Sequence, residues 1–155
     1  MTKIKDDQEK RITGLQKEQD LSQFKALLLQ KYYEDVQAII DILQVMTNSG
    51  ISWGEIQRQI KEERKANNPL ANLIYSMNFE KNQISLILDA VNEDEEQDEK
   101  FQIDDQYLSN FDPVMKIDID LTISAQLNIR KYFEIKKKSQ EKEQKTKDAS
   151  VIAIQ

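Results

Sequence analysis

The sequence contains no cysteine and no histidine among its 155 residues. Their absence excludes disulfides, zinc sites built from Cys or His, thiol nucleophiles and His-based acid–base catalysis. Glycine is also scarce, and the three glycines form neither a G-x-G-x-x-G pattern nor a P-loop. We therefore predict that the chain is not an enzyme, that it holds no cofactor or metal, and that it works by binding.

Long apolar runs are missing as well. No stretch approaches the roughly 18 apolar residues of a membrane span, and no apolar segment follows the first residues as in a signal peptide. We expect a cytoplasmic protein without a membrane partner, and a fragment of a longer chain fits the same features. Charged residues make up 32% of the chain and apolar residues 39%, which favours long, half-exposed helices. The net charge of −6 argues against bulk nucleic-acid binding but allows a local basic face.

The first part of the chain predicts a helical arm. Residues 1–23 are polar and predict either a solvated helix or a disordered lead. Residues 24–47 then carry apolar side chains at spacings of three and four, which is typical of a coiled-coil arm and equally of an amphipathic core helix. The seam consists of Leu29, Tyr32, Val36, Ile39, Leu43 and Met46, and Ile42 is among the residues that widen it.

A compact helical head is predicted for residues 48–124. Gly50 suits the left-handed turn that ends the arm, and Ser52 with Glu55 forms a capping box that begins a helix near Trp53. Asn68 and Pro69 begin a second helix that we expect to run to about Met77. The predicted head core is Trp53, Ile56, Ile60, Leu73 and Ile74. We favour Trp53 as a core anchor over an exposed binding residue.

Two strands are predicted inside the head. Residues 83–88 are β-compatible, and residues 114–121 alternate apolar and polar side chains. We expect them to pair as an antiparallel hairpin across a disordered acidic loop, residues 90–113. An untethered loop is preferred there over a docking segment built from Phe101, Tyr107, Leu108 and Phe111. Asp118 and Asp120 fit the polar face of a strand far better than a metal site, because no third ligand is in sight.

A returning arm is predicted from Ala125 to residue 155, where it is truncated. Its apolar face consists of Leu127, Ile129, Tyr132, Phe133 and Ile135, and residues 136–147 resemble a solvated helix. The predicted fold is therefore mainly α with a small two-stranded antiparallel hairpin, in which long antiparallel helical arms carry a compact helical head. We expect Val36, Ile39 and Leu43 to face Leu127, Ile129 or Phe133.

Basic side chains supply the candidate contact residues. A solvated helix face is the simpler interpretation, and contact with phosphates or an acidic partner is the functional one. The candidates are Arg58, Lys61, Arg64, Lys65, Arg130 and Lys131.

Several sequence pieces in one order carry a resemblance to a known family. The chain resembles the middle region of the nuclear export mediator factor family, the NFACT-type proteins of ribosome-associated quality control. The resemblance covers about Lys25 to Lys147. Its pieces are 25–29 (KALLL), 50–56 (GISWGEI), 60–63 (IKEE) with 68–71 (NPLA), 82–88 (NQISLIL), 117–125 (IDIDLTISA) and 130–133 (RKYF).

The resemblance implies the end of a first coiled-coil arm, the M domain and the start of the returning arm. Family members bind the 60S ribosomal subunit with its peptidyl-tRNA, help to recruit the Listerin ubiquitin ligase and direct C-terminal (CAT) tailing. The implied partners are rRNA, ribosomal proteins and a Listerin-type ligase. Contacts with tRNA are implied only for family domains that this sequence does not contain. The alternative is a generic coiled-coil adaptor or scaffold without a ribosome link.

Overall fold

The computed structural model describes residues 2–78, 80–91, 103 and 105–154. The chain folds into two compact units. The first, the helical pair, consists of residues 1–26 and 130–155, and the second, the sheet unit, consists of residues 27–129. The elements are α1 (Thr2–Lys31), α2 (Tyr33–Asn48), α3 (Trp53–Lys65), α4 (Pro69–Leu73), β1 (Ile74–Asn78), β2 (Gln83–Asp89), α5 (Asp105–Asn110), β3 (Val114–Asp120) and α6 (Ala125–Ile154).

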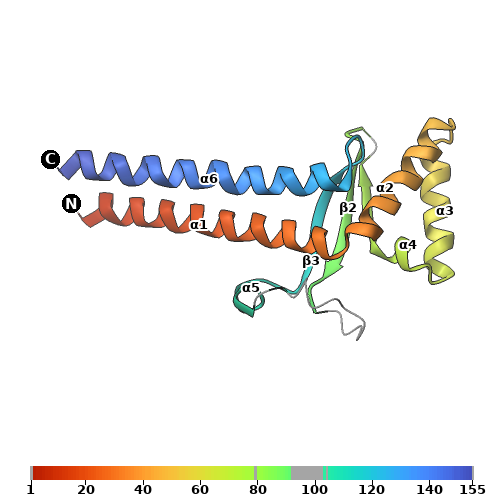
Figure 1. The fold of residues 1–155 in the computed structure, drawn as a ribbon, viewed down its shortest axis with the longest axis horizontal. Coiled ribbons are helices and arrows are strands. Elements are labelled where there is room, and N and C mark those ends of the chain that lie inside the picture. The colour runs from red at the N-terminus through yellow and green to blue at the C-terminus, as the bar shows by residue number, and fades with distance from the viewer. Residues whose placement is uncertain (1, 79, 92–102, 104, 155) are drawn as a thin grey trace. The chain divides into compact units, whose positions relative to one another are not determined.

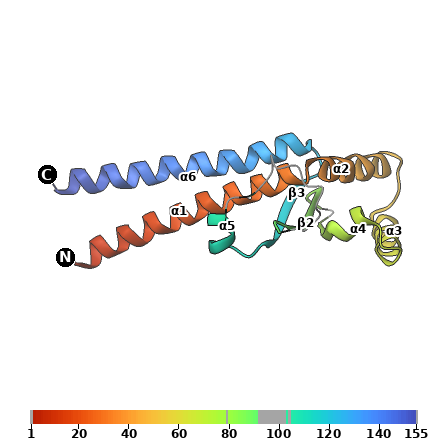
Figure 2. The same cartoon turned by 60° about the horizontal axis from the view of Figure 1, so that its bottom comes forward.

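A three-stranded antiparallel sheet in the order β1-β2-β3 organises the sheet unit (Figures 1 and 2). Strand β2 pairs with β3 from Gln83 opposite Asp120 to Asp89 opposite Val114. This register confirms the predicted pairing of the two strands. Their alternating side chains bury one face, as a period of two requires. The buried residues are Ile84, Leu86, Leu88, Ile117 and Ile119.

The third strand was not predicted. The helix expected to run from Pro69 to Met77 ends at Leu73, and Ile74–Asn78 forms strand β1 instead. Strand β1 pairs with β2, with a bulge between Ile74 and Ser76. The edge of β2 supplies backbone hydrogen-bond partners for residues 74–78, and pairing with it buries Ile74. These gains outweigh the weak helical preference of this short segment.

The expected seam of residues 24–47 is interrupted at Tyr32, where α1 ends and α2 begins. The Tyr32 hydroxyl donates to the carbonyl of Asp89 (2.8 Å), and Lys31 Nζ donates to the carbonyl of Ala90 (2.9 Å). Both contacts tie the break to the end of β2. Val36, Ile39 and Leu43 are buried, as expected. Leu127, one of their expected partners, is instead 41% exposed.

The predicted helix caps are present. Ser52 Oγ accepts from the amide of Glu55 (3.3 Å), Asn68 Oδ1 accepts from the amide of Leu70 (3.0 Å), and Gly50 has a φ of +79°. The Glu55 carboxylate contacts Arg58 rather than returning to the cap as a capping box would predict. Local sequence signals therefore place the helix starts correctly.

The long acidic loop is described only in part. Residues 92–102 and 104, with most of the carboxylates and Phe101, lie outside the described residues. The amide of Ala90 donates to the carbonyl of Pro113 (2.8 Å), so the two ends of the segment meet. Asp105–Asn110 forms helix α5, so the prediction of disorder through residue 113 is wrong for these residues. Tyr107 and Phe111 are half-buried there, and burial of such aromatic area favours local order.

Helices α1 and α6 lie antiparallel in the helical pair (Figure 1). Lys25 Nζ lies 5.8 Å from the ring centre of Tyr132, and Ser139 Oγ donates to the carbonyl of Leu15 (2.9 Å). Residue numbers therefore fall along α1 as they rise along α6. Residues 2–23 form helix rather than a disordered lead. None of the described helices is both long enough and apolar enough to cross a membrane.

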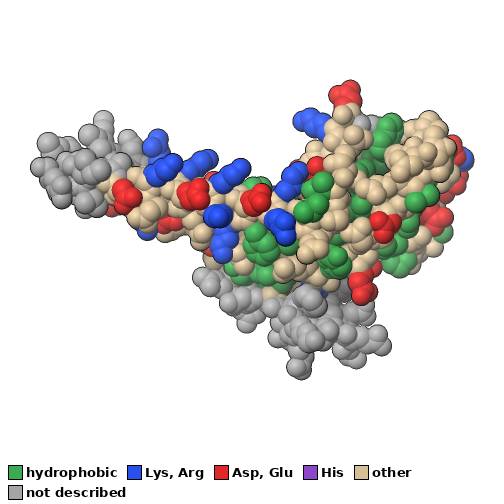
Figure 3. All heavy atoms as spheres, turned by 45° about the horizontal axis from the view of Figure 1, so that its top comes forward, with side chains coloured by type: hydrophobic (Ala, Val, Ile, Leu, Met, Phe, Trp, Pro, Cys, Tyr) green, Lys and Arg blue, Asp and Glu red, His purple; other side chains and the backbone are tan. Residues whose placement is uncertain are grey.

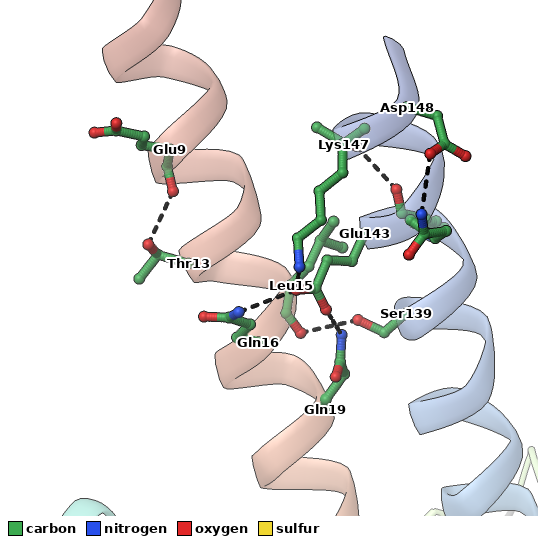
Figure 4. A network of polar contacts seen from close by, with 12 residues as sticks. Glu9, Thr13, Leu15, Gln16, Gln19, Ser139, Glu143, Lys147 and Asp148 are labelled. Atoms are coloured by element: carbon green, nitrogen blue, oxygen red, sulfur yellow. Dashed lines mark hydrogen bonds and ion pairs between the residues drawn. The ribbon is translucent and has the colours of Figure 1, made fainter. Parts of the chain in front are cut away.

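Glu143 is the centre of a polar network between the two helices (Figure 4). Its carboxylate accepts from Gln19 Nε2 (2.6 Å) and Gln16 Nε2 (3.0 Å) of α1, and pairs with Lys147 Nζ (3.1 Å) on its own helix. The hydrogen bond from Gln19, then those from Lys147 and Gln16, hold the pKa of Glu143 below its ordinary value. The charged form of Glu143 is therefore the one that the helical pair stabilises.

Asn128 closes the turn from β3 into α6. Its side chain is 2% exposed; Oδ1 accepts from the Asp120 amide (2.8 Å), and Nδ2 donates to the carbonyls of Asp120 (3.1 Å) and Ser124 (2.9 Å). A carboxamide can satisfy donors and acceptors together in this way. Replacing it leaves buried backbone groups without partners.

We expect Asn128→Ala to lower the free energy of unfolding by about 3 kcal/mol, because three hydrogen bonds are lost and two groups of Asp120 lose their partner. Urea denaturation followed by circular dichroism measures the change. The control Leu127→Ala, at the exposed neighbouring position, should cost less than about 1 kcal/mol. Equal losses in the two variants would contradict this role of Asn128.

We expect Glu143→Gln to lower stability at pH 7 by about 1 kcal/mol. Because the pKa of Glu143 is depressed in the folded protein, its contribution is complete above the unfolded value of about 4.3 and is lost as pH falls through the folded value. Urea midpoints of the variant and the parent should therefore differ at pH 7 and converge as the pH falls through the folded pKa of Glu143. The control Glu141→Gln, at an exposed position of the same helix, should match the parent across this range. A difference between parent and Glu143→Gln that stays constant across this range would contradict the prediction.

Candidate functional site

The predicted basic face of α3 is largely balanced by its own carboxylates. Arg58 pairs with Glu55 and with Glu62 (3.0 Å), and these contacts lower the pKa of Glu55 and raise that of Arg58. Arg64 is half-buried, and its Nε donates to the carbonyl of Ala71 (3.1 Å), so it fastens α4 to α3. Two of the four candidate side chains on α3, those of Arg58 and Arg64, thus have partners within the sheet unit.

The remaining candidates are exposed but belong to different units. Lys61 and Lys65 lie on α3 in the sheet unit, and Arg130 and Lys131 lie on α6 in the helical pair. The ion pairs of Arg58 could have been predicted from the sequence. Glu55 and Glu62 stand three and four residues from Arg58, and residues at these spacings are neighbours on a helix.

The predicted head core is only partly buried. Ile56 and Ile74 are buried, whereas Trp53, Ile60 and Leu73 are half-buried. Trp53 lines an open pocket of about 360 Å³ together with amide and hydroxyl side chains. Its lining also includes Leu43, Gln44, Thr47, Asn48, Asn82, Leu121 and Thr122.

An apolar groove between α2, α3 and α4 was not foreseen. It has a volume of about 270 Å³, and we call it the α2–α3 groove. It is lined by Ile39, Ile42, Leu43, Met46, Gln59, Ile60, Glu63, Asn68, Leu70, Ala71 and Ile74. Ile42 is 50% exposed, and Val45, one turn further along α2, is 64% exposed. The sequence assigned Ile42 to the buried face, because periodicity does not show where neighbouring helices stop covering a helix. Adjacent exposed aliphatic side chains are typical of a contact surface.

Asp118 and Asp120 have local partners. Ser85 Oγ donates to Asp118 Oδ1 (2.6 Å), and Asp120 Oδ1 accepts from the amide (2.8 Å) and the hydroxyl (2.5 Å) of Thr122. These contacts favour a structural role. Within the described part of the chain, no three carboxylates gather as a metal site would require.

Comparison with known proteins gives one informative similarity. No family model matches the chain. The chain is similar to the ribosome quality control complex subunit NEMF homolog of Drosophila melanogaster, with 34% identity over 156 residues. The match covers 99% of this chain and 15% of that protein, so the chain spans a small part of its relative's length.

The comparison therefore confirms the resemblance carried by the sequence pieces: the chain is similar to one segment of an NFACT-type ribosome quality control subunit.

Proposed function

We propose that this chain acts in the cytoplasm as the arm-and-head segment of a ribosome-associated quality control factor. In this role it binds the 60S subunit that still holds peptidyl-tRNA and helps to recruit a Listerin-type ubiquitin ligase. The observation that carries the proposal is the 34% identity to a ribosome quality control subunit across nearly the whole chain. Contacts with tRNA and C-terminal tailing belong, in this proposal, to other parts of the full-length factor.

The α2–α3 groove is the proposed docking site for the ligase. Its apolar lining and the exposed Ile42 and Val45 suit one face of an amphipathic segment. Glu63 is the charged residue in the groove lining, so the segment that fits would carry a basic residue beside its apolar ones. The occupant we propose is such a segment of the ligase.

The ribosome contacts are proposed for the exposed basic side chains. Lys61 and Lys65 on α3, and Arg130 and Lys131 on α6, are exposed, and we propose that they contact phosphates or acidic ribosomal proteins. We propose a smaller contribution to ribosome contacts from Arg58 and Arg64, because their partners within the protein compete with an external partner.

Sedimentation with purified 60S subunits tests this proposal. We expect the full chain to sediment with 60S subunits that carry peptidyl-tRNA at low salt and to be released at about 0.5 M salt, because screening weakens exposed charge contacts. Ribosome-free runs provide the control. A chain that stays at the top of the gradient at low salt would favour the generic adaptor or scaffold.

The same gradients test the ligase site when a Listerin-type ligase is added. We expect Ile42→Glu to leave sedimentation of the chain unchanged but to reduce co-sedimenting ligase at least tenfold, because a charge is placed in an apolar contact. The matched control Val114→Glu, at an exposed position of β3, should retain the ligase. Equal recruitment by both variants would exclude the groove as the docking site.

A further inference from the structure

The half-buried Trp53 lines the open pocket of about 360 Å³ described above, which we call the Trp53 pocket. Its lining comes from α2, from the start of α3, from the turn between β1 and β2, and from the residues that follow β3. None of the described residues that line it is basic. An indole ring in a wall without positive charge suits a cation, because the face of an aromatic ring is negative.

The hydroxyl and amide side chains of the pocket use hydrogen-bond donors within the protein. Gln44 Nε2 donates to the carbonyl of Leu121 (2.6 Å), and Thr47 Oγ1 donates to the carbonyl of Gln44 (3.0 Å). Thr122 Oγ1 donates to Asp120 Oδ1 (2.5 Å). A hydroxyl has one hydrogen, so both threonines can only accept further hydrogen bonds. The lining therefore favours a ligand that donates them.

Two sources of negative charge lie at the wall of the Trp53 pocket. The carboxylate of Asp120 is one hydrogen bond away from the lining residue Thr122. Gln44 and Thr47 lie near the C-terminal end of α2, and its last turn contains no basic residue. The C-terminal end of a helix carries a partial negative charge that attracts cations. Both features favour a positive ligand over a neutral or a negative one.

The charge of the whole sheet unit acts in the same direction. Residues 27–129 contain eight basic and nineteen acidic residues, a net charge of −11, whereas the whole chain carries −6. In the space-filling view, basic side chains gather along the helical pair, and acidic and hydrophobic ones are more frequent over the sheet unit (Figure 3). A field of this sign raises the local concentration of cations and disfavours anions.

We propose that the Trp53 pocket binds one basic side chain, arginine or lysine, of a protein partner. Leu43 and Leu121 in the lining suit the apolar stem of such a side chain, and the acceptors and the ring of Trp53 suit its charged end. The site is distinct from the α2–α3 groove, with which it shares only Leu43. It also does not depend on the proposed ribosomal function.

The fluorescence of Trp53 tests this proposal directly, because it is the only tryptophan of the chain. The full chain is titrated at constant ionic strength with acetylated and amidated tripeptides Gly-Arg-Gly, Gly-Lys-Gly and Gly-citrulline-Gly. Citrulline keeps the shape of arginine but is neutral. We expect a saturable change with both basic peptides and at least tenfold weaker binding of the citrulline peptide. Equally tight binding of the arginine and citrulline peptides, or no saturable change with a basic one, would overturn the proposal.

A charge-removing variant tests the contribution of the wall. Asp120→Asn keeps an oxygen that accepts from the amide of Thr122 (2.8 Å), and circular dichroism checks that the variant is folded. We expect it to bind the arginine peptide at least threefold more weakly at about 100 mM salt and the citrulline peptide unchanged.

The matched control for this variant is Asp112→Asn, at the other end of β3. Asp112 Oδ1 accepts from the amide of Val114 (2.9 Å), so the same local contact and the same charge are changed there. We expect Asp112→Asn to bind the arginine peptide within twofold of the parent. Equal weakening in the two variants would show that only the overall charge matters and would overturn the assignment of the Trp53 pocket.

Discussion

The return of α6 against α1 is the constraint on which the architecture depends. It joins segments separated by more than 120 positions, such as Leu15 and Ser139. In the helical pair the apolar Phe24 and Ala26 are buried, and so are the polar residues Gln19, Ser22 and Ser139. The side chain of Ser139 is small, which lets the two helices approach closely. Its hydroxyl donates a hydrogen bond to the backbone carbonyl of Leu15 on the other helix. The contact also decides which face of α6 is exposed, and hence where the lysines point.

The sheet unit holds the two ends of the long acidic segment, residues 90–113, next to each other. The ladder of β2 and β3 and the hydrogen bond between Ala90 and Pro113 bring its two ends together. Asn128 then fixes the exit of β3 into α6. The buried faces of the sheet and of α2 supply the apolar core of the unit, while Ile42 and Val45 remain uncovered.

Features with a local cause could be predicted from the sequence. The caps at Ser52 and Asn68, the turn at Gly50 and the alternating strand before Leu121 each depend on a few neighbouring residues. Features that depend on distant partners could not. Strand β1 forms because β2 offers an edge, and α1 ends at Lys31 because Tyr32 reaches Asp89. Hydrophobic periodicity could not predict that residues 2–23 pair with α6, because the buried residues in this range, Gln19 and Ser22, are polar.

The candidate site was predicted in outline but not in detail. The sequence located basic residues on α3, and the structure pairs Arg58 with two carboxylates and gives Arg64 to a carbonyl. Charge counts along a sequence do not distinguish a neutralised arginine from an available lysine. Exposure and partners make that distinction, and they shift attention to α6 and to the groove beside α2.

Site-specific disulfide formation tests the antiparallel return most directly, because the chain has no cysteine of its own. With cysteine replacing Leu15 and Ser139, whose backbone and side chain are in contact, mild oxidation should give a single intramolecular link. The pair Leu15→Cys/Ile135→Cys, with Ile135 exposed one turn away, should stay reduced. Failure of the first pair to link, or equal linking by the second, would contradict the pairing of α1 with α6.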